Sequence, residues 1–286
     1  MAAQLIDGKA LSASVKEALR LQTEELKAAG ITPGLAVILV GEDPGSQIYV
    51  RNKEKACEQI GIRSVVLRLP DTTTQQELEE HIRIFNEDEA IDGILVQVPL
   101  PKHMDEAAAL SLIRPDKDVD GFHVVSMGRL FGGLDTLVAC TPKGVLEMIH
   151  STGVSLTGKE AVVVGRSNNV GKPIAMLLLQ ENATVTMCHS RTKDLKAHTR
   201  RADILVAAVG RPKFITGDMI KPGAVVIDVG INRVDGKVIG DVDFESASQA
   251  AGYISPVPGG VGLMTVAMLM KNTLQIANTR LAGKKA

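Results

Sequence analysis

The sequence predicts an α/β protein of two domains, each built around a parallel sheet. Seven short runs rich in β-branched residues alternate with helical patterns, as expected of parallel strands joined by crossover helices. The 286 residues exceed the length at which one hydrophobic core stops growing, and 45% of them are apolar, enough for two cores. Aromatic residues are only 2%, so aliphatic side chains must fill those cores.

The predicted strands are predominantly apolar runs, which is typical of strands buried on both faces. They cover residues 35–40, 64–69, 92–98, 161–165, 183–188, 203–210 and 224–230. Helical patterns occupy roughly 10–29, 44–60, 74–87, 143–151, 171–181 and 262–281. The helix at 44–60 has clear boundary signals, with Asp43 as its N-cap, Pro44 in its first turn and Gly61 at its end.

An irregular, glycine-rich segment at about 113–142 separates the first three predicted strands from the other four. We predict the domain junction within this segment. Residues 1–138 would then form the first domain and residues 139–263 the second, with the last helix, about 264–286, packing back on the first domain.

Charge and cysteine content exclude several classes of function. A net charge of −1 provides no basic surface for nucleic acid or an anionic membrane. Asp7 and Lys9 interrupt the stretch where a secretion signal needs apolar residues, and no apolar run is long enough to span a membrane. Three widely spaced cysteines, at 57, 140 and 188, argue against a disulfide framework or structural zinc. We therefore expect a soluble cytoplasmic protein.

A nucleotide site is predicted where the strand at 161–165 meets the helix at 171–181. Gly165 and Gly171 bracket a tight turn, so backbone N–H groups and the positive end of the helix can hold a pyrophosphate. The spacing is GxSxxxG rather than the GxGxxG of dinucleotide-binding folds, and a merely tight turn is the alternative.

The end of the following strand favours NADP over NAD. An NAD enzyme has an acidic residue there for the ribose hydroxyls, whereas this chain has Ser190 and Arg191. Together with Arg166 in the preceding turn, they offer a hydroxyl and two cations, which suit a 2′-phosphate. Solvated surface charge is the alternative interpretation for both arginines.

Candidate catalytic residues lie on the helix at 44–60 and at the end of the strand at 92–98. Ser46, Tyr49 and Lys53 occupy positions i, i+3 and i+7, so they share a face and Tyr49 can hydrogen-bond Lys53. The spacing alone also fits a solvated helix surface. Gln97 adds context, because it places an amide at the carboxyl end of a strand, where open α/β sheets bind ligands. A core glutamine is the alternative.

A loop with three carboxylates, Asp116, Asp118 and Asp120, follows in the chain. The spacing could indicate calcium, but Lys117 intervenes and the loop lacks the glycine and distal glutamate of an EF-hand. We predict no metal site.

Six separated motifs give the most specific signal. They are Ser46–Lys53, Asp92–Pro101, Lys117–His123, Cys140–Pro142, Val164–Ser167 and Pro256–Gly262. Together, in this order, they resemble the bifunctional methylenetetrahydrofolate dehydrogenase/cyclohydrolase family over nearly the whole chain. The resemblance implies an N-terminal α/β catalytic domain, a Rossmann-like NADP-binding domain with a parallel sheet, and a homodimer.

The resemblance also implies residue roles. Lys53 would be catalytic, Tyr49 and Gln97 would position it and the substrate, and Asp120 would hold the pterin ring. The other folate contacts would be Val96, Val98, Pro258, Gly259, Gly260, Val261 and Gly262. The NADP contacts would be Gly165, Arg166, Ser167, Ser190, Arg191 and Ile231.

The implied activity is NADP-dependent oxidation of 5,10-methylene-tetrahydrofolate to 5,10-methenyl-tetrahydrofolate, then hydrolysis to 10-formyl-tetrahydrofolate. This is one-carbon folate chemistry of the kind that serves purine biosynthesis. A lysine at its ordinary pKa of about 10.4 would be protonated at neutral pH. We hypothesise that burial beside a cationic substrate lowers the pKa of Lys53, which then acts as a base through water.

The sequence departs from the family pattern at Leu263 and Val124, where prolines are usual, and at Asn169, where an apolar residue is usual. None of these removes a reacting group, but the lost prolines leave more freedom in the loops. A shikimate-type dehydrogenase is an alternative that leaves Pro256–Gly262 unexplained. A catalytically silent NADP- or folate-binding regulator is another, and it would be expected to lose Lys53 or Gln97.

Overall fold

The computed structural model describes residues 3–285, and side chains through residue 283. It confirms the predicted α/β class with parallel sheets and forms two compact units. Unit 1 comprises Met1–Ala13, Leu130–Leu134 and Thr141–Thr265, and unit 2 comprises Ser14–Arg129, Asp135–Cys140 and Val266–Ala286. These units differ from the predicted ranges chiefly at the N-terminus, where β1 joins the sheet of unit 1.

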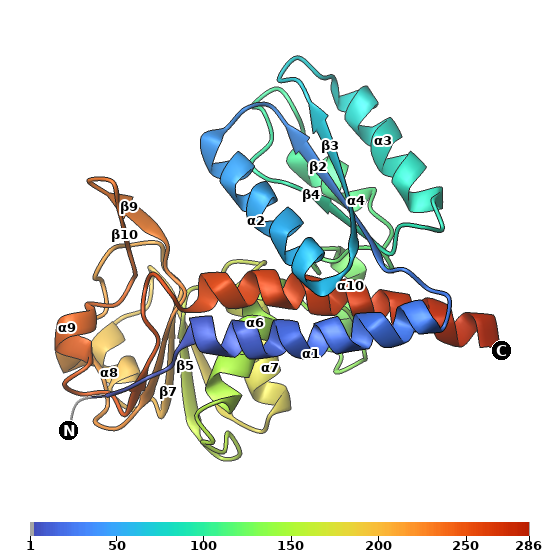
Figure 1. Ribbon diagram of the computed structural model, residues 1–286. Coiled ribbons are helices and arrows are strands. Elements are labelled where there is room, and N and C mark those ends of the chain that lie inside the picture. The colour runs from blue at the N-terminus through green and yellow to red at the C-terminus, as the bar shows by residue number, and fades with distance from the viewer. Residues whose placement is uncertain (1–2, 286) are drawn as a thin grey trace. The chain divides into compact units, whose positions relative to one another are not determined.

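Unit 2 is built on a three-stranded parallel sheet in the order β3-β2-β4. Its strands are β2 (Gly34–Val40), β3 (Arg63–Leu69) and β4 (Gly93–Val96). Helices α2 (Pro44–Ile60) and α3 (Gln75–Glu87) connect them and lie on opposite sides of the sheet (Figure 1). Every residue of β2 is buried, because helices cover both faces of this central, wholly apolar strand.

Alternation along β2 separates the two faces of that sheet. Ala36, Ile38 and Val40 pack in one cluster with Leu78 and Ile82 of α3. Successive residues of a strand point to opposite faces, so the intervening residues of β2 face the side of α2. The core of unit 2 therefore fixes α2 and β4 against the same strand.

The boundaries of α2 are those predicted from its capping residues. The Asp43 side chain accepts a hydrogen bond from Ser46 N at 2.7 Å, and Pro44 stands in the first turn. Gly61 ends the helix with φ of 87°, a left-handed conformation that favours glycine. Because α2 begins four residues after β2 ends, its first turns lie near the carboxyl edge of the sheet.

Unit 1 contains a six-stranded parallel sheet in the order β1-β11-β8-β7-β5-β6. These strands are β1 (Gln4–Leu5), β5 (Glu160–Val164), β6 (Thr184–Cys188), β7 (Ile204–Ala207), β8 (Val225–Asp228) and β11 (Tyr253–Ile254). The direction of winding reverses at β5, which lies between β6 and β7. In open α/β sheets such a reversal creates the crevice in which ligands bind.

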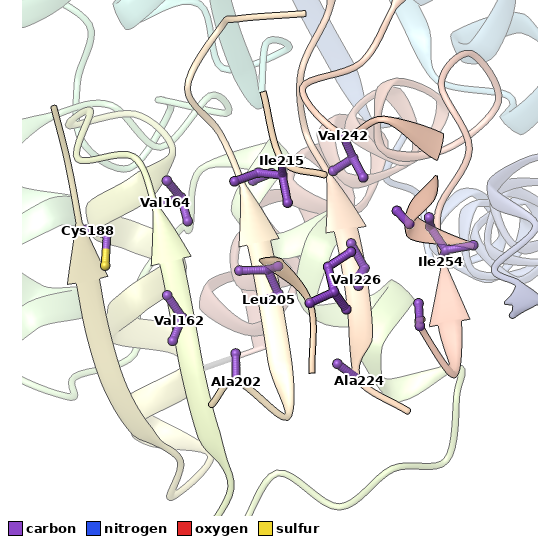
Figure 2. Close-up of a cluster of buried hydrophobic side chains, with 14 residues drawn as sticks. Val162, Val164, Cys188, Ala202, Leu205, Ile215, Ala224, Val226, Val242 and Ile254 are labelled. Carbon is purple, nitrogen blue, oxygen red and sulfur yellow. The ribbon is translucent and has the colours of Figure 1, made fainter. Parts of the chain in front are cut away.

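One face of this sheet is covered by a continuous apolar cluster. Val164 of β5, Leu205 of β7, Val226 of β8 and Ile254 of β11 line it, and all are at most 1% exposed. Figure 2 shows these side chains side by side across the strands.

The remaining elements complete the two units. They are α1 (Gly8–Ala28), α4 (Glu106–Ser111), α5 (Val124–Phe131), α6 (Cys140–His150), α7 (Gly171–Gln180), α8 (Leu195–Thr199), the 3₁₀ helix η1 (Gly217–Met219), β9 (Asn232–Val234), β10 (Lys237–Ile239), α9 (Phe244–Ala247) and α10 (Val261–Lys285). No helix within residues 3–285 is both long and apolar enough to cross a membrane.

Two differences from the predicted elements have local causes. The segment at 113–142 is not irregular throughout, since it contains α5, whose apolar residues are interrupted by Gly128. The predicted strands at 92–98, 203–210 and 224–230 are shorter in the structure, because their last apolar residues belong to loops at the carboxyl edges.

Candidate active site and nucleotide site

Lys53 and Gln97 meet at the carboxyl edge of the sheet of unit 2. Lys53 Nζ of α2 donates a hydrogen bond to Gln97 Oε1, just beyond β4, at 2.9 Å. Gln97 Nε2 donates to Val98 O at 2.7 Å, and its backbone N donates to Ile38 O. The side-chain amide of Gln97 is therefore hydrogen-bonded through both its nitrogen and its oxygen, and the oxygen faces Lys53.

Asp120 belongs to the same cluster through its charge. Burial raises the pKa of Asp120 to about 6, the Lys53 ammonium acts in the opposite direction, and Asp118 adds a smaller upward effect. For Lys53, burial lowers the pKa, while the negative charge of Asp120 opposes that change. The site thus holds a cation whose proton is easier to lose than that of an exposed lysine.

The neighbouring Asp118 has a structural role that the sequence did not reveal. It is 4% exposed and accepts hydrogen bonds from Gly121 N at 3.2 Å and His123 N at 2.7 Å. Gly121 has φ of 70°, and a Cβ atom there would lie 2.5 Å from Ala139 N, so this turn requires glycine. Asp118 therefore fixes the loop that contains Asp120. In the sequence, only the alternation of acidic residues at 116, 118 and 120 pointed to this loop.

Ser46, Tyr49 and Lys53 differ in solvent exposure, although their helical spacing predicts that they share one face. Tyr49 is 42% exposed, whereas Ser46 is 3% exposed. Within the described residues no hydrogen bond joins Tyr49 to Lys53, because the lysine turns toward Gln97 instead. Val96 is buried and Val98 half-buried, so the strand end offers mainly Gln97 to a ligand.

Five of the six predicted NADP contacts, all except Ile231, lie at the ends of two neighbouring strands in unit 1. Val164 of β5 is paired with Cys188 of β6, and Gly165 N donates to Cys188 O at 2.9 Å. Arg166 and Ser167 follow the first strand, Ser190 and Arg191 follow the second, and all four are exposed. The structure therefore places two cationic side chains and two hydroxyls along one edge.

The glycine turn after β5 is tightly packed. A Cβ atom at Gly165 would overlap Ala208 O, and one at Gly171 would overlap Gly165 O. Gly171 N donates to Ser167 Oγ at 3.3 Å at the start of α7. This backbone geometry, with exposed arginines on either side, fits a dinucleotide whose pyrophosphate lies on the turn and whose 2′-phosphate lies near Arg191.

The loop predicted to border the folate lies beside Ile231 in unit 1. Ile231 is 52% exposed, and a Cβ atom at Gly262 would lie 3.7 Å from Ile231 Cδ1. Pro258 is exposed, Gly259 has φ of 105°, and both Gly260 and Val261 are buried. The structure thus brings one predicted cofactor residue next to the predicted folate loop.

Comparison with family models matches both halves of the chain. Residues 6–120 match the tetrahydrofolate dehydrogenase/cyclohydrolase catalytic domain, and residues 139–281 match the NAD(P)-binding domain of the same family. The bifunctional protein FolD of Acetivibrio thermocellus is 57% identical over 278 residues, which is 97% of this chain and 98% of that protein.

Solved structures give the same result. The bifunctional FolD enzyme of Campylobacter jejuni is 49% identical, with a TM-score of 0.95 over 98% of this chain and 100% of the other. The dehydrogenase-cyclohydrolase of Trypanosoma brucei, solved with NADP cofactor and an inhibitor, is 42% identical, with a TM-score of 0.93 over 98% and 99%.

Proposed function

The chain belongs to the tetrahydrofolate dehydrogenase/cyclohydrolase family, and from this premise we propose that it catalyses two consecutive reactions. The first oxidises 5,10-methylene-tetrahydrofolate to the 5,10-methenyl cation with NADP as the acceptor. The second adds water to that cation and opens the ring to 10-formyl-tetrahydrofolate, releasing one proton.

For the first reaction the protein must mainly position two carbon atoms, since no proton leaves the reacting carbon. NADP, when bound, supplies the hydride acceptor. Gly165, Arg166, Ser167, Ser190 and Arg191 would hold its phosphates, and Ile231 would contact its nicotinamide half. Support comes from the exposed cations at the ends of β5 and β6 and from the proximity of Ile231 to Gly262 in the loop at 258–262.

For the second reaction the protein must remove a proton from water, and Lys53 is our candidate base. The observation that supports it most directly is the 2.9 Å hydrogen bond from Lys53 Nζ to Gln97 Oε1, on a lysine whose pKa burial lowers. Gln97 would orient the amine, while Asp120 would bind the pterin ring and limit how far that pKa falls. A methenyl cation beside Lys53 would lower its pKa further.

The remaining folate contacts that we propose are the exposed Tyr49 of α2, Val96 and Val98 at the end of β4, and Pro258, Gly259, Gly260, Val261 and Gly262. Aromatic stacking on the pterin is the physical role that suits Tyr49, whose ring is 42% exposed.

We further propose that the enzyme is a cytoplasmic homodimer whose product serves purine biosynthesis. Cys57 and Cys188 are free, and all three cysteines are buried, which fits a reducing compartment. Strands β9 and β10 pair only with each other among the described residues, so their outer edges offer backbone groups to a second copy. Analytical ultracentrifugation of the purified chain tests the dimer.

A single assay tests the function. Purified protein is incubated with 5,10-methylene-tetrahydrofolate and either NADP or NAD, and methenyl absorbance and reduced cofactor are followed separately. We expect reduced cofactor with NADP, and methenyl product that appears and is consumed. Failure of both reactions in folded protein would instead support a catalytically silent folate- or NADP-binding protein.

A further inference from the structure

Asp241 is a buried carboxylate that gathers several backbone groups at the carboxyl edge of the sheet of unit 1. Its side chain is 0% exposed. Oδ2 accepts hydrogen bonds from Val209 N at 2.6 Å and Gly210 N at 2.9 Å. Oδ1 accepts from Arg211 N at 2.9 Å and from Asn232 Nδ2 at 2.9 Å. Four N–H donors thus converge on one carboxylate.

These donors come from two separate loops. Residues 209–211 follow β7, and Asn232 lies four residues after β8 ends. The first loop adjoins the glycine turn, since a Cβ atom at Gly165 would overlap Ala208 O. The second contains Ile231, which lies near Gly262 of the loop at 258–262. Asp241 therefore ties together two loops at the crevice created by the reversal at β5.

A second buried carboxylate holds Asp241 in place. Asp228, 4% exposed, accepts from Asp241 N and Gly230 N through Oδ1 and from Val242 N through Oδ2, each at 2.9 Å. Figure 2 shows Val242 beside the carboxyl ends of the central strands. Cβ atoms at Gly230 and Gly240 would overlap the carboxyl oxygens of Asp241 and Asp228 respectively, so both glycines permit this approach.

Strand order indicates which part of the cofactor these loops face. The predicted 2′-phosphate residues follow β6 and the predicted pyrophosphate turn follows β5. A dinucleotide that crosses the sheet in this direction continues over β7 and β8 with its nicotinamide half. Those are the strands whose following loops Asp241 anchors.

We propose that Asp241 is the positioning residue for the nicotinamide half of the cofactor site. Its oxygens are already occupied by four donors, so it acts through the backbone of 209–211 and through Ile231 rather than by touching the cofactor. Burying two adjacent carboxylates costs free energy unless their oxygens accept hydrogen bonds. Here those hydrogen bonds come from the loops that face the proposed cofactor site, so they also fix these loops. The inference rests on the proposed dehydrogenase activity.

The variant D241N tests this proposal, because an amide NH₂ must replace one oxygen and face two N–H donors. We expect the Kd for NADP to rise at least tenfold and the dehydrogenase kcat/KM to fall with it. Cyclohydrolase activity on methenyl-tetrahydrofolate without NADP, which depends on Lys53 in unit 2, should stay within twofold. D243N is the control, since Asp243 lies two residues away and pairs with Ser246 and Lys213 instead.

Three results would overturn the proposal. One is an NADP Kd for D241N equal to that of D243N, and another is a parallel loss of both activities with a lower Tm, which would mean a purely structural role. If D241N does not fold, N232A removes one donor and should raise the NADP Kd by a smaller factor, and no rise there would also refute it. Absence of dehydrogenase activity in the unaltered protein would refute the proposed function itself.

Discussion

Lys53 Nζ lies 2.9 Å from Gln97 Oε1, and this hydrogen bond joins helix α2 to the carboxyl end of β4. The partner of the lysine is a neutral amide, whereas the negative charge that most strongly raises the pKa of Lys53 is that of Asp120. A neutral partner orients the amine without strongly favouring its protonated form, which is what a base at neutral pH requires.

Replacing the amide by a carboxylate should therefore impair the base. In Q97E a negative charge at hydrogen-bond distance favours protonated Lys53, and its pKa should rise. Because the deprotonated fraction grows as pH passes that pKa, the rising limb of the cyclohydrolase kcat profile should move to higher pH. A pH profile between 6 and about 10 checks the shift. An unmoved limb would show that Lys53 is not the titrating group.

Removing the opposing charge should have the opposite effect. The carboxylate of Asp120 raises the pKa of Lys53, so in D120N that pKa should fall and the rising limb should move to lower pH. KM for folate should rise as well, since Asp120 is also our proposed pterin contact. Measuring kcat at saturating substrate separates the two effects, and a shift toward higher pH would contradict the electrostatic account.

Cofactor choice should depend on Arg191. Loss of one charge-assisted contact to a 2′-phosphate is worth about 1.5–3 kcal/mol, or roughly 10- to 100-fold. R191M should therefore raise KM for NADP by that factor and leave KM for NAD nearly unchanged. Steady-state kinetics with both cofactors test this. R200M, which removes another exposed arginine of unit 1, serves as the control, and an equal effect of both variants would argue against a specific site.

Stability should depend on the ion pair between Asp92 and Arg280. Arg280 Nε lies 3.0 Å from Asp92 Oδ1, and the Asp92 side chain is only 1% exposed. R280M removes the ion-pair partner of a buried carboxylate that keeps its hydrogen bond from Gly34 N at 2.8 Å, so the cost at neutral pH should be at most about 3–5 kcal/mol.

Lowering the pH should reduce the loss of stability in R280M. Burial already raises the pKa of Asp92, and loss of the cation raises it further. A raised folded-state pKa means that stability is lost as pH rises through it, so the deficit of R280M should be smaller at about pH 5 than at pH 7. Urea midpoints at the two pH values measure the change. In R83M, which breaks the surface pairs of Arg83 with Glu79 and Glu80, the loss should be below about 1 kcal/mol, and a similar loss in both variants would contradict this account.

The sequence was most informative where local chemistry sets the structure. Asp43 and Gly61 mark the ends of α2 because caps depend on adjacent residues, and Gln97 stands out as an amide at the end of an apolar strand. By contrast, β1 has two residues and pairs only with β11, about 250 residues away in the chain, among the described residues. No local pattern encodes such a contact.

The same distinction applies to the site residues. Asp118 and Asp120 look alike in sequence, yet one caps a loop and the other lies beside Lys53, and only the folded turn at Gly121 separates their roles. Asp241 gave no signal, because three of its four donors lie about 30 residues away in the chain. The role of each predicted site residue stays a prediction until the variants are measured.

The variant K53M tests the central claim most directly, because it removes the amine while keeping an unbranched side chain of similar length. Cyclohydrolase and dehydrogenase activities are measured separately on the same folded preparation, with Tm as a check. The account predicts that cyclohydrolase activity falls by about 10²-fold or more, as expected on loss of a general base, while hydride transfer to NADP is partly retained. Survival of both activities to the same extent would contradict the assignment of Lys53 as the base.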